Sequence, residues 1–382
     1  MKPIHPFPAR MAPEILEDKL AGLGRDAAIW DPMCGSGTSL RVAASLGIRA
    51  VGTDTDPLAV KMARVGTRRF DAKALSAANE IMEDRVRSGR RRVARDSCAE
   101  TQEFKNYWFA ETQQQDLALI ARQIETVGNP ELREFYEIAL SRIIITKFRG
   151  ASLAWDVSHS RPHRVRTEND FDTRTEFMRS CQRLAAICVE TPPRASVIVE
   201  QGDARTFKTS TKVELVVTSP PYLNAIDYMR GHKLSLVWLG WTIPQLRELR
   251  SNAIGTERRL DAFDDGQKLV EVERVAVRSS GGQSRITAVI RRYISDCAAL
   301  MTNIRESMAS ASELVMVVAD SNVRGHTLNS AKLFEKLAIQ NGLRKLRAEK
   351  RGLPASKRYL PTDTDQGIGN RMKTEHILHF ST

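Results

Sequence analysis

The chain has 382 residues, of which 42% are hydrophobic and 27% charged, and it contains no apolar run near the roughly 18 residues that span a bilayer. This composition predicts a globular, cytoplasmic protein without membrane segments, and five cysteines without a CxxC pair argue against a disulfide framework or a structural zinc. The net charge of +12 favours a polyanionic partner, with nucleic acid the leading candidate.

The first part of the chain alternates between strand-like and helix-like sequence. Residues 27–31 form a short apolar run, a glycine-containing stretch follows at 32–37, and the next residues have a helical pattern. A second strand is predicted at 49–54, and in the helix after it Asp56 fits the N-cap and Pro57 the first position. This order predicts a βαβ unit.

The alternation stops at residues 71–192, where the pattern is mainly helical. Two stretches stand out within this block. Residues 85–95 hold six arginines in eleven positions, and aromatic residues cluster at 106–111. We interpret 71–192 as a helical insertion and the arginine run as a candidate for contacts with phosphates.

Strand-like sequence returns after the insertion. The predicted elements are strands at 195–200, 213–217 and 312–320, a helix near 329–340, and two final strands near 343–350 and 372–380. Without the insertion the chain has the pattern of five βα-type units and a terminal β-hairpin. The predicted fold class is therefore α/β, with a doubly wound, mostly parallel sheet formed by residues 1–70 and 193–382.

The stretch AspProMetCysGlySerGlyThr (31–38) has the features of a ligand-binding loop. Gly35 and Gly37 permit a tight turn, and the N-terminus of the next helix offers free N–H groups. The Lys-Ser/Thr pair of phosphate-binding loops is absent, whereas Asp54 ends the second strand, where a carboxylate can accept both hydroxyls of a ribose. The pattern suits a nucleoside without a polyphosphate, and S-adenosylmethionine (SAM) is such a ligand.

Residues 218–222 read TSPPY, directly after the strand predicted at 213–217. The two prolines lack an N–H group, so they end the strand. Open α/β sheets bind ligands at the carboxyl ends of their strands. Four features are predicted to meet at that edge: the glycine loop, Asp54, Asp203 and TSPPY.

Three motifs together resemble the SAM-dependent amino-methyltransferases of the N4-cytosine/N6-adenine DNA family. They are AspProMetCysGlySerGlyThr (31–38), ValGlyThrAspThrAspPro (51–57) and ThrSerProProTyr (218–222), and HisProPheProAlaArgMetAlaProGlu (5–14) also looks like the family's N-terminal motif. The resemblance covers about 1–65 and 195–380, and the order of the motifs excludes the permuted members of the family. It implies a class I, Rossmann-like methyltransferase fold with SAM as methyl donor and no metal.

The resemblance also implies roles for the matching residues. The target base would be received by the catalytic residues Ser219, Pro220, Pro221 and Tyr222. The N-terminal segment would close over the methionine end of SAM with His5, Phe7 and Arg10. The methionine part would be surrounded by Asp31, Pro32, Cys34, Gly35, Ser36, Gly37 and Thr38. The ribose would be bound by Asp54 and the adenine amino group by Asp203.

The implied reaction is methyl transfer to the exocyclic amine of a base flipped out of double-stranded DNA. A serine at 219, where many adenine enzymes have aspartate, favours cytosine N4 over adenine N6. The alternatives are an RNA guanine-N2 methyltransferase and a catalytically inactive, SAM-sensing DNA-binding protein, whereas a protein-glutamine methyltransferase would be expected to have asparagine at 219. Residues 71–192 and 245–285 are the candidates for reading the DNA sequence, and a restriction-modification role would add a cognate restriction enzyme as partner.

Overall fold

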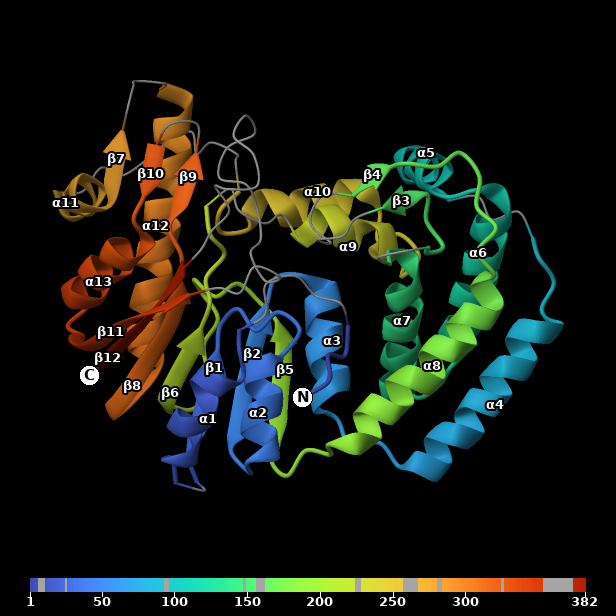
Figure 1. Ribbon diagram of the computed structural model, residues 1–382, viewed down its shortest axis with the longest axis horizontal. Coiled ribbons are helices and arrows are strands. Elements are labelled where there is room, and N and C mark those ends of the chain that lie inside the picture. The colour runs from blue at the N-terminus through green and yellow to red at the C-terminus, as the bar shows by residue number, and fades with distance from the viewer. Residues whose placement is uncertain are drawn as a thin grey trace.

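The computed structural model describes residues 1–5, 11–24, 26–92, 96–146, 149–155, 162–223, 228–256, 267–279, 284–323, 326–352 and 374–382. Its central sheet has seven strands in the order β11-β12-β8-β6-β1-β2-β5 (Figure 1). In chain order these strands are β1 (Ala28–Asp31), β2 (Arg49–Asp54), β5 (Val197–Gln201), β6 (Val213–Thr218), β8 (Met308–Val318), β11 (Arg344–Gly352) and β12 (Thr374–Ser381).

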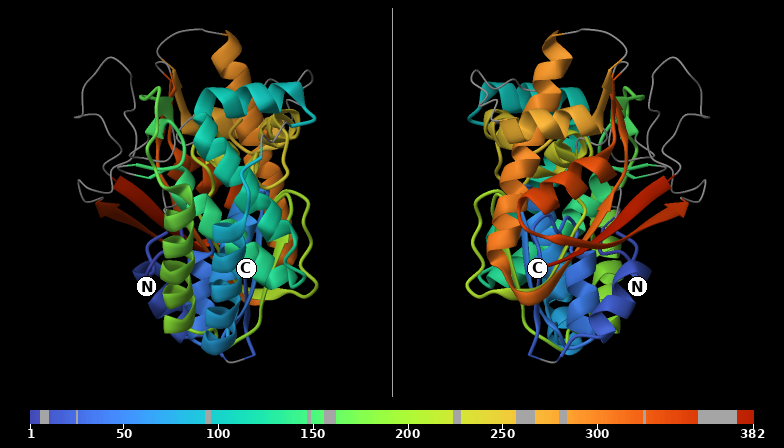
Figure 2. Two further views of the ribbon diagram at one scale, coloured as in Figure 1. Left: turned by 90° about the vertical axis from the view of Figure 1, so that its right-hand side faces the viewer. Right: turned by 90° about the vertical axis from the view of Figure 1, so that its left-hand side faces the viewer.

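Strand direction confirms the predicted fold class. Strands β1, β2, β5, β6 and β8 run parallel, whereas β12 is antiparallel to both β8 and β11. The last two strands therefore form the terminal hairpin that the sequence predicted, and Figure 2 shows it projecting from the body of the protein. The sheet is doubly wound and mostly parallel, as the sequence predicted.

Helices cover both faces of the sheet, which explains the nearly continuous apolar sequence of its central strands. Leu215 and Val217 of β6 face one side, and Val216 faces the other. The first side is covered by α1 (Glu14–Ala21), α2 (Thr38–Ser45) and α3 (Pro57–Thr67). The second side is covered by α11 (Gln267–Ala276), α12 (Ser284–Ser307) and α13 (Ser330–Gln340).

Two features differ from the sequence prediction. Turns rather than a helix join β5 to β6, so the expectation of five βα-type units was wrong for this connection. A second, three-stranded sheet was also missed, with the order β7-β10-β9. Its strands β7 (Val277–Ser279), β9 (Ser321–Val323) and β10 (His326–Leu328) have three residues each, too few for an alternating pattern to be recognised.

Residues 71–192 are helical, as their pattern indicated. They contain α4 (Ala72–Ser88), α5 (Ala99–Trp108), α6 (Glu111–Glu125), α7 (Pro130–Ile144) and α8 (Thr173–Glu190), with the two-residue strands β3 (Ala154–Trp155) and β4 (His163–Arg164) between α7 and α8. Their apolar core also includes side chains of α3 and of two later helices, α9 (Tyr228–Leu236) and α10 (Ile243–Asn252). Within the described ranges, no helix is both long and apolar enough to cross a bilayer.

At least one arginine of the run at 85–95 has a structural role. Arg91 donates to both carboxylate oxygens of Asp116, at 2.8 and 2.9 Å, and Arg174 of α8 donates to the same carboxylate at 2.7 Å. Asp116 is almost completely buried, so this ion pair holds the segment after α4 against α6 and α8. The contact of Arg91 is therefore internal, and the phosphate-contacting role of the run stays a prediction.

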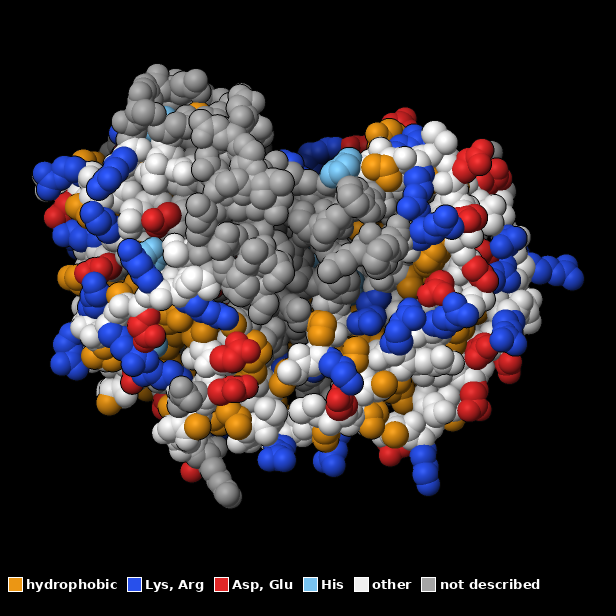
Figure 3. All heavy atoms as spheres, viewed as in Figure 1, with side chains coloured by type: hydrophobic (Ala, Val, Ile, Leu, Met, Phe, Trp, Pro, Cys, Tyr) orange, Lys and Arg blue, Asp and Glu red, His pale blue; other side chains and the backbone are white. Residues whose placement is uncertain are grey.

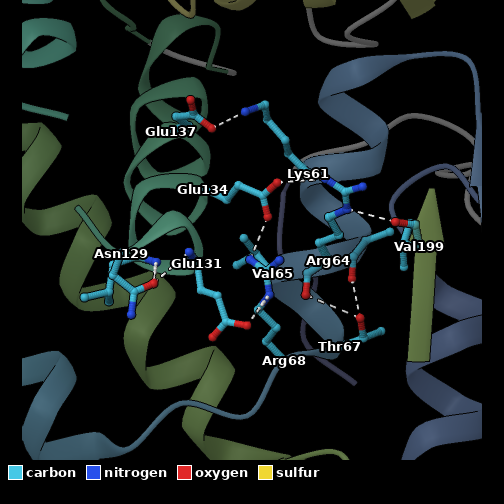
Figure 4. Close-up of polar contacts among 12 residues, drawn as sticks. Lys61, Arg64, Val65, Thr67, Arg68, Asn129, Glu131, Glu134, Glu137 and Val199 are labelled. Carbon is cyan, nitrogen blue, oxygen red and sulfur yellow. Dashed lines mark hydrogen bonds and ion pairs between the residues drawn. The ribbon is translucent and has the colours of Figure 1, made fainter. Parts of the chain in front are cut away.

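A row of ion pairs attaches the helical block to the catalytic sheet (Figure 4). Arg64 and Arg68 of α3 both donate to Glu134 of α7, at 3.0 and 2.6 Å. Arg64 also donates to the carbonyl of Val199 in β5 at 2.9 Å, and Lys61 pairs with Glu137 one turn further along. The orientation of α7 is thus tied to α3, the helix that begins next to the predicted ribose site.

We expect Glu134→Ala to lower the free energy of unfolding by about 1 to 2 kcal/mol, because two arginines lose a half-buried acceptor. Urea unfolding would measure the change. The matched control is Glu131→Ala, since Glu131 is more exposed and contacts Arg68 only at 3.4 Å. Equal effects of the two variants would contradict the structural role of Glu134.

Candidate active site

The predicted site features lie at one edge of the sheet because their strands are parallel. The glycine loop follows β1, Asp54 ends β2, Asp203 follows β5 and TSPPY ends β6. These strands point the same way, so their carboxyl ends share the upper rim of the sheet in Figure 1. Residues far apart in sequence are thereby brought to one place, which is where ligands bind in this class of sheet.

The backbone of the glycine loop is set by internal hydrogen bonds and by positive φ angles. Cys34 N donates to Thr53 O at 2.9 Å, and Gly37 N donates to Cys34 O at 2.8 Å. Gly37, with φ of 76°, is the N-cap of α2, and a Cβ atom there would lie 2.8 Å from Cβ of Ala63. Only glycine fits this position, so the N-terminus of α2 stays open toward the rim.

Asp31 is the buried acid of this loop. Its Oδ1 accepts from Met33 N at 3.2 Å, and its Oδ2 accepts from the hydroxyl of Ser39. Burial raises the pKa of Asp31 to about 7 despite these hydrogen bonds. Ser39, which the sequence prediction did not include, therefore orients the acid from the first turn of α2. Of the other predicted residues, Pro32, Cys34 and Ser36 lie in the loop, and Thr38 is the first residue of α2.

Asp54 links the two loops of the predicted cofactor site. Its Oδ2 accepts from Gly35 N at 2.9 Å, and its Oδ1 accepts from Asp56 N at 2.9 Å. Burial raises the pKa of Asp54 to about 6, and the neighbouring charge of Asp56 adds to the effect. A carboxylate held in this way at the end of β2 is chemically suited to accept the two hydroxyls of a ribose.

Asp56 caps α3, as its sequence position suggested. Its Oδ1 accepts from Leu58 N at 2.9 Å, and Pro57 occupies the first turn. Its Oδ2 contacts Nδ1 of His232 in α9, and both side chains are buried. Burial alone would raise the pKa of Asp56, but the charge and hydrogen bond of His232 lower it below its usual value. No local pattern indicated this partner, which lies 176 positions away.

Asp203 lies at the predicted place, but its carboxylate is already paired. Arg205 donates from Nε to Oδ1 at 3.0 Å and from Nη2 to Oδ2 at 2.6 Å, and it also pairs with Asp296 of α12. Burial alone would raise the pKa of Asp203, but these hydrogen bonds lower it. A contact with the adenine amino group would have to share this carboxylate with Arg205, so that role stays a prediction.

The TSPPY segment leaves β6 with Pro220 buried and Ser219, Pro221 and Tyr222 half-buried. The carbonyl of Pro221 accepts a hydrogen bond from the hydroxyl of Tyr293 in α12 at 3.0 Å. Burial raises the pKa of Tyr293 far above its usual range, which keeps the hydroxyl protonated as a donor. Tyr293, missed by the sequence prediction, thus fixes the second proline of the motif.

The N-terminal motif is described only as far as His5. Its Nε2 lies 2.9 Å from the hydroxyl of Ser141 in α7, and the backbone before it is held by Arg41, which donates to Lys2 O at 2.8 Å. Phe7 and Arg10, two of the predicted cofactor residues, lie outside the described residues. The structure therefore places His5 against the helical block, and its predicted role at the cofactor stays untested.

Metal ligands are a further question for any such site. In the part of the chain that the structure describes, no group of three or more His, Cys, Asp and Glu side chains is arranged to hold a metal ion. The donor set at the rim consists of two carboxylates, glycine backbone and a helix N-terminus. This set fits a nucleoside with a charged amino-acid tail, as in SAM.

We expect the affinity for SAM to fall about tenfold between pH 7 and pH 5, because the ribose hydroxyls require ionised Asp54, whose pKa is about 6. The sign follows from the raised pKa: protonation below pH 6 removes the acceptor, and SAM binding is coupled to proton release. Calorimetric titration at several pH values would measure this dependence. A constant affinity over the same range would exclude Asp54 as the titrating acceptor.

Comparisons with known proteins agree on the methyltransferase class. The family model "RRNA methyltransferase AviRa" matches residues 2–169. The type II methyltransferase M.MvaI of Kocuria varians is 24% identical over 263 residues, which cover 62% of this chain and 56% of that protein. The chain thus spans little more than half the length of this curated relative.

Solved structures of methyltransferases also match. A SAM-dependent methyltransferase of Methanosarcina mazei matches with a TM-score of 0.35 and 8% identity, covering 98% of this chain and 99% of that one. The rRNA methyltransferase AviRa of Streptomyces viridochromogenes matches with a TM-score of 0.29 and 11% identity, covering 85% of each chain. Both sequence matches, to the AviRa family model and to M.MvaI, are thus matches to methyltransferases.

Proposed function

We propose that the chain transfers a methyl group from SAM to an exocyclic amine of a DNA base, with cytosine N4 favoured over adenine N6. One observation carries the proposal. β6, which ends in TSPPY, pairs directly with β1, which leads into the glycine loop, with Ile29 opposite Leu215 and Trp30 opposite Val216. A base held by the motif would therefore lie beside the methyl donor. The serine at 219 supports cytosine in this proposal.

The chemistry needs positioning rather than a covalent nucleophile. SAM, when bound, supplies a methyl group on a positively charged sulfur. Ser219 Oγ and the Pro220 carbonyl would accept hydrogen bonds from the amine and favour a pyramidal nitrogen with its lone pair free. The new N–C bond forms as the C–S bond breaks, and the amine proton passes to solvent. Positioning of this kind can contribute on the order of 7 to 11 kcal/mol.

The surroundings of the motif support this assignment of roles. Tyr222 offers a half-buried ring on which a flipped base could stack, next to the carbonyl that Tyr293 fixes. No cysteine is required, and burial raises the pKa of the Cys34 thiol, which keeps it neutral. The cysteine of the glycine loop is thus suited to packing, not to nucleophilic attack.

Two regions beside the rim are candidates to contact the nucleic acid. On one side are α5, β3 and β4 of residues 71–192, and on the other are α11 and β7, which belong to residues 245–285 (Figure 1). Tyr107 of α5 is about half exposed, and the guanidinium of Arg164 lies 5.0 Å from its ring centre. Figure 3 shows Lys and Arg side chains interspersed with Asp and Glu side chains over this part of the molecule. The net charge of +12 of the whole chain suits phosphates, and binding should weaken steeply with salt.

RNA is the second candidate substrate. The observation that favours it is the match of the AviRa rRNA methyltransferase family to residues 2–169, a range that includes the glycine loop and most of the helical block. The family model does not extend to TSPPY. The same amine chemistry would apply to a guanine N2 in RNA, so the substrate must be decided by experiment.

The decisive experiment is to incubate the purified protein with methyl-labelled SAM and either duplex DNA or ribosomal RNA, and to identify the modified nucleoside by mass spectrometry. N4-methylcytosine is the expected product. N6-methyladenine would keep the mechanism and overturn the choice of base, and label only in RNA would replace the proposed substrate. SAM binding without label in either polymer would favour a catalytically inactive SAM sensor.

A further inference from the structure

Helix α9 begins at residue 228, shortly after the TSPPY motif, and two of its buried side chains make polar contacts with other elements, one with Asp56 and one with Ser141 of α7. These are His232 and Ser235, which are close to one helical turn apart and so lie on the same side of α9. Neither contact is needed to hold a helix in an apolar core. Burying a polar pair costs desolvation free energy, so two buried pairs on one helix suggest a role beyond packing.

The first contact leads to the predicted ribose carboxylate. Nδ1 of His232 contacts Oδ2 of Asp56, while Asp56 N donates to Oδ1 of Asp54 at 2.9 Å. Asp56 therefore connects α9 to Asp54. Its side chain contacts His232 of the helix, and its backbone N–H donates to the carboxylate of Asp54. Asp56 is also the N-cap of α3.

The second contact leads to the N-terminal motif. The hydroxyl of Ser141 in α7 donates to Ser235 at 3.0 Å and lies 2.9 Å from Nε2 of His5. Ser141 thus bridges His5 of the N-terminal motif and Ser235 of α9. His5 directly precedes the segment predicted to close over the methionine end of SAM. Helix α9 is thus joined to both ends of the predicted cofactor site.

We propose that occupation of the cofactor site orders α9, the helix that begins shortly after the TSPPY motif, and that His232 is the positioning residue. The inference rests on the proposed function, because it assumes a SAM nucleoside at Asp54. A ligand that engages Asp54 would restrict Asp56 and, through His232, the helix that follows TSPPY.

The experiment uses S-adenosylhomocysteine as the probe, since it has the ribose and amino-acid parts of SAM and needs no methyl acceptor. Hydrogen exchange of the amides of residues 228–236 is measured with and without the probe, and its affinity is measured by calorimetry. We expect the probe to slow exchange in α9 about tenfold in the native protein. In His232→Ala we expect binding within about threefold of native but no change in α9 exchange.

Matched variants separate coupling from simple packing. His232→Asn keeps an N–H donor toward Asp56 and should restore the response of α9. Protection of α9 in His232→Ala equal to that in the native protein would overturn the role of His232. If His232→Ala does not fold, the measurement on the native protein still tests the proposal. A bound probe that leaves the exchange of α9 in the native protein unchanged would overturn the coupling. Failure of the native protein to bind the probe would instead overturn the proposed function as well.

Discussion

Ser219→Ala is expected to lower the turnover number about 100-fold or more, because one hydrogen bond to the reacting amine is lost in the transition state. Affinity for SAM should stay within about twofold, because Ser219 belongs to the predicted base site rather than to the glycine loop. The hydroxyl is half-buried, and among the described residues it has no hydrogen-bond partner that the substitution would leave unpaired. Single-turnover methylation and SAM binding would be measured on the same preparation.

The matched control for this variant is Ser45→Ala. Ser45 lies in the last turn of α2, at the end of the helix opposite the glycine loop, and its hydroxyl donates only to Val42 O within the same helix. It should leave turnover and SAM affinity unchanged. A Ser219→Ala protein with native turnover would show that the serine does not contact the reacting amine, and the role proposed for Ser219 would then be wrong.

Asp54→Ala should weaken SAM binding about 100-fold, because two hydrogen bonds to a charged acceptor are lost and each contributes about 1.5 kcal/mol. Part of the loss in affinity would come from disorder of the loop, because the same carboxylate also accepts hydrogen bonds from Gly35 N and Asp56 N. The variant should therefore also be less stable without ligand. Calorimetric binding and thermal unfolding would separate the two losses.

Asp71→Ala is the control for Asp54→Ala. Asp71 is an exposed aspartate that accepts from Ala74 N at 2.8 Å as the N-cap of α4, away from the rim. Its loss should cost about 1 kcal/mol of stability through the cap and leave SAM affinity unchanged. If Asp54→Ala bound SAM as tightly as Asp71→Ala does, the ribose would have to be held by another group.

Local patterns in the sequence were sufficient for most of the catalytic fold. The strand at 49–54 and the cap and first residue of α3 were predicted at the positions where they occur, because each depends on neighbouring residues only. The terminal hairpin was also predicted, and the ends of β1, β2, β5 and β6 were placed within a few residues. Parallel direction then follows from the βαβ connections, which brings these ends to one rim. The short sheet of β7, β9 and β10 was not predicted from these local patterns.

The sequence by itself determined which residue types stand at the rim: the glycines at 35 and 37, the acids at 31 and 54, and the serine and prolines of TSPPY. Only the tertiary structure decided which partners complete them. Tyr293 reaches the Pro221 carbonyl from 72 positions away, and His232 reaches Asp56 from 176. Arg205, two residues from Asp203, was available to sequence reasoning, but its second partner Asp296 was not. Contacts of this kind depend on how helices pack across the sheet, and no local periodicity encodes that packing.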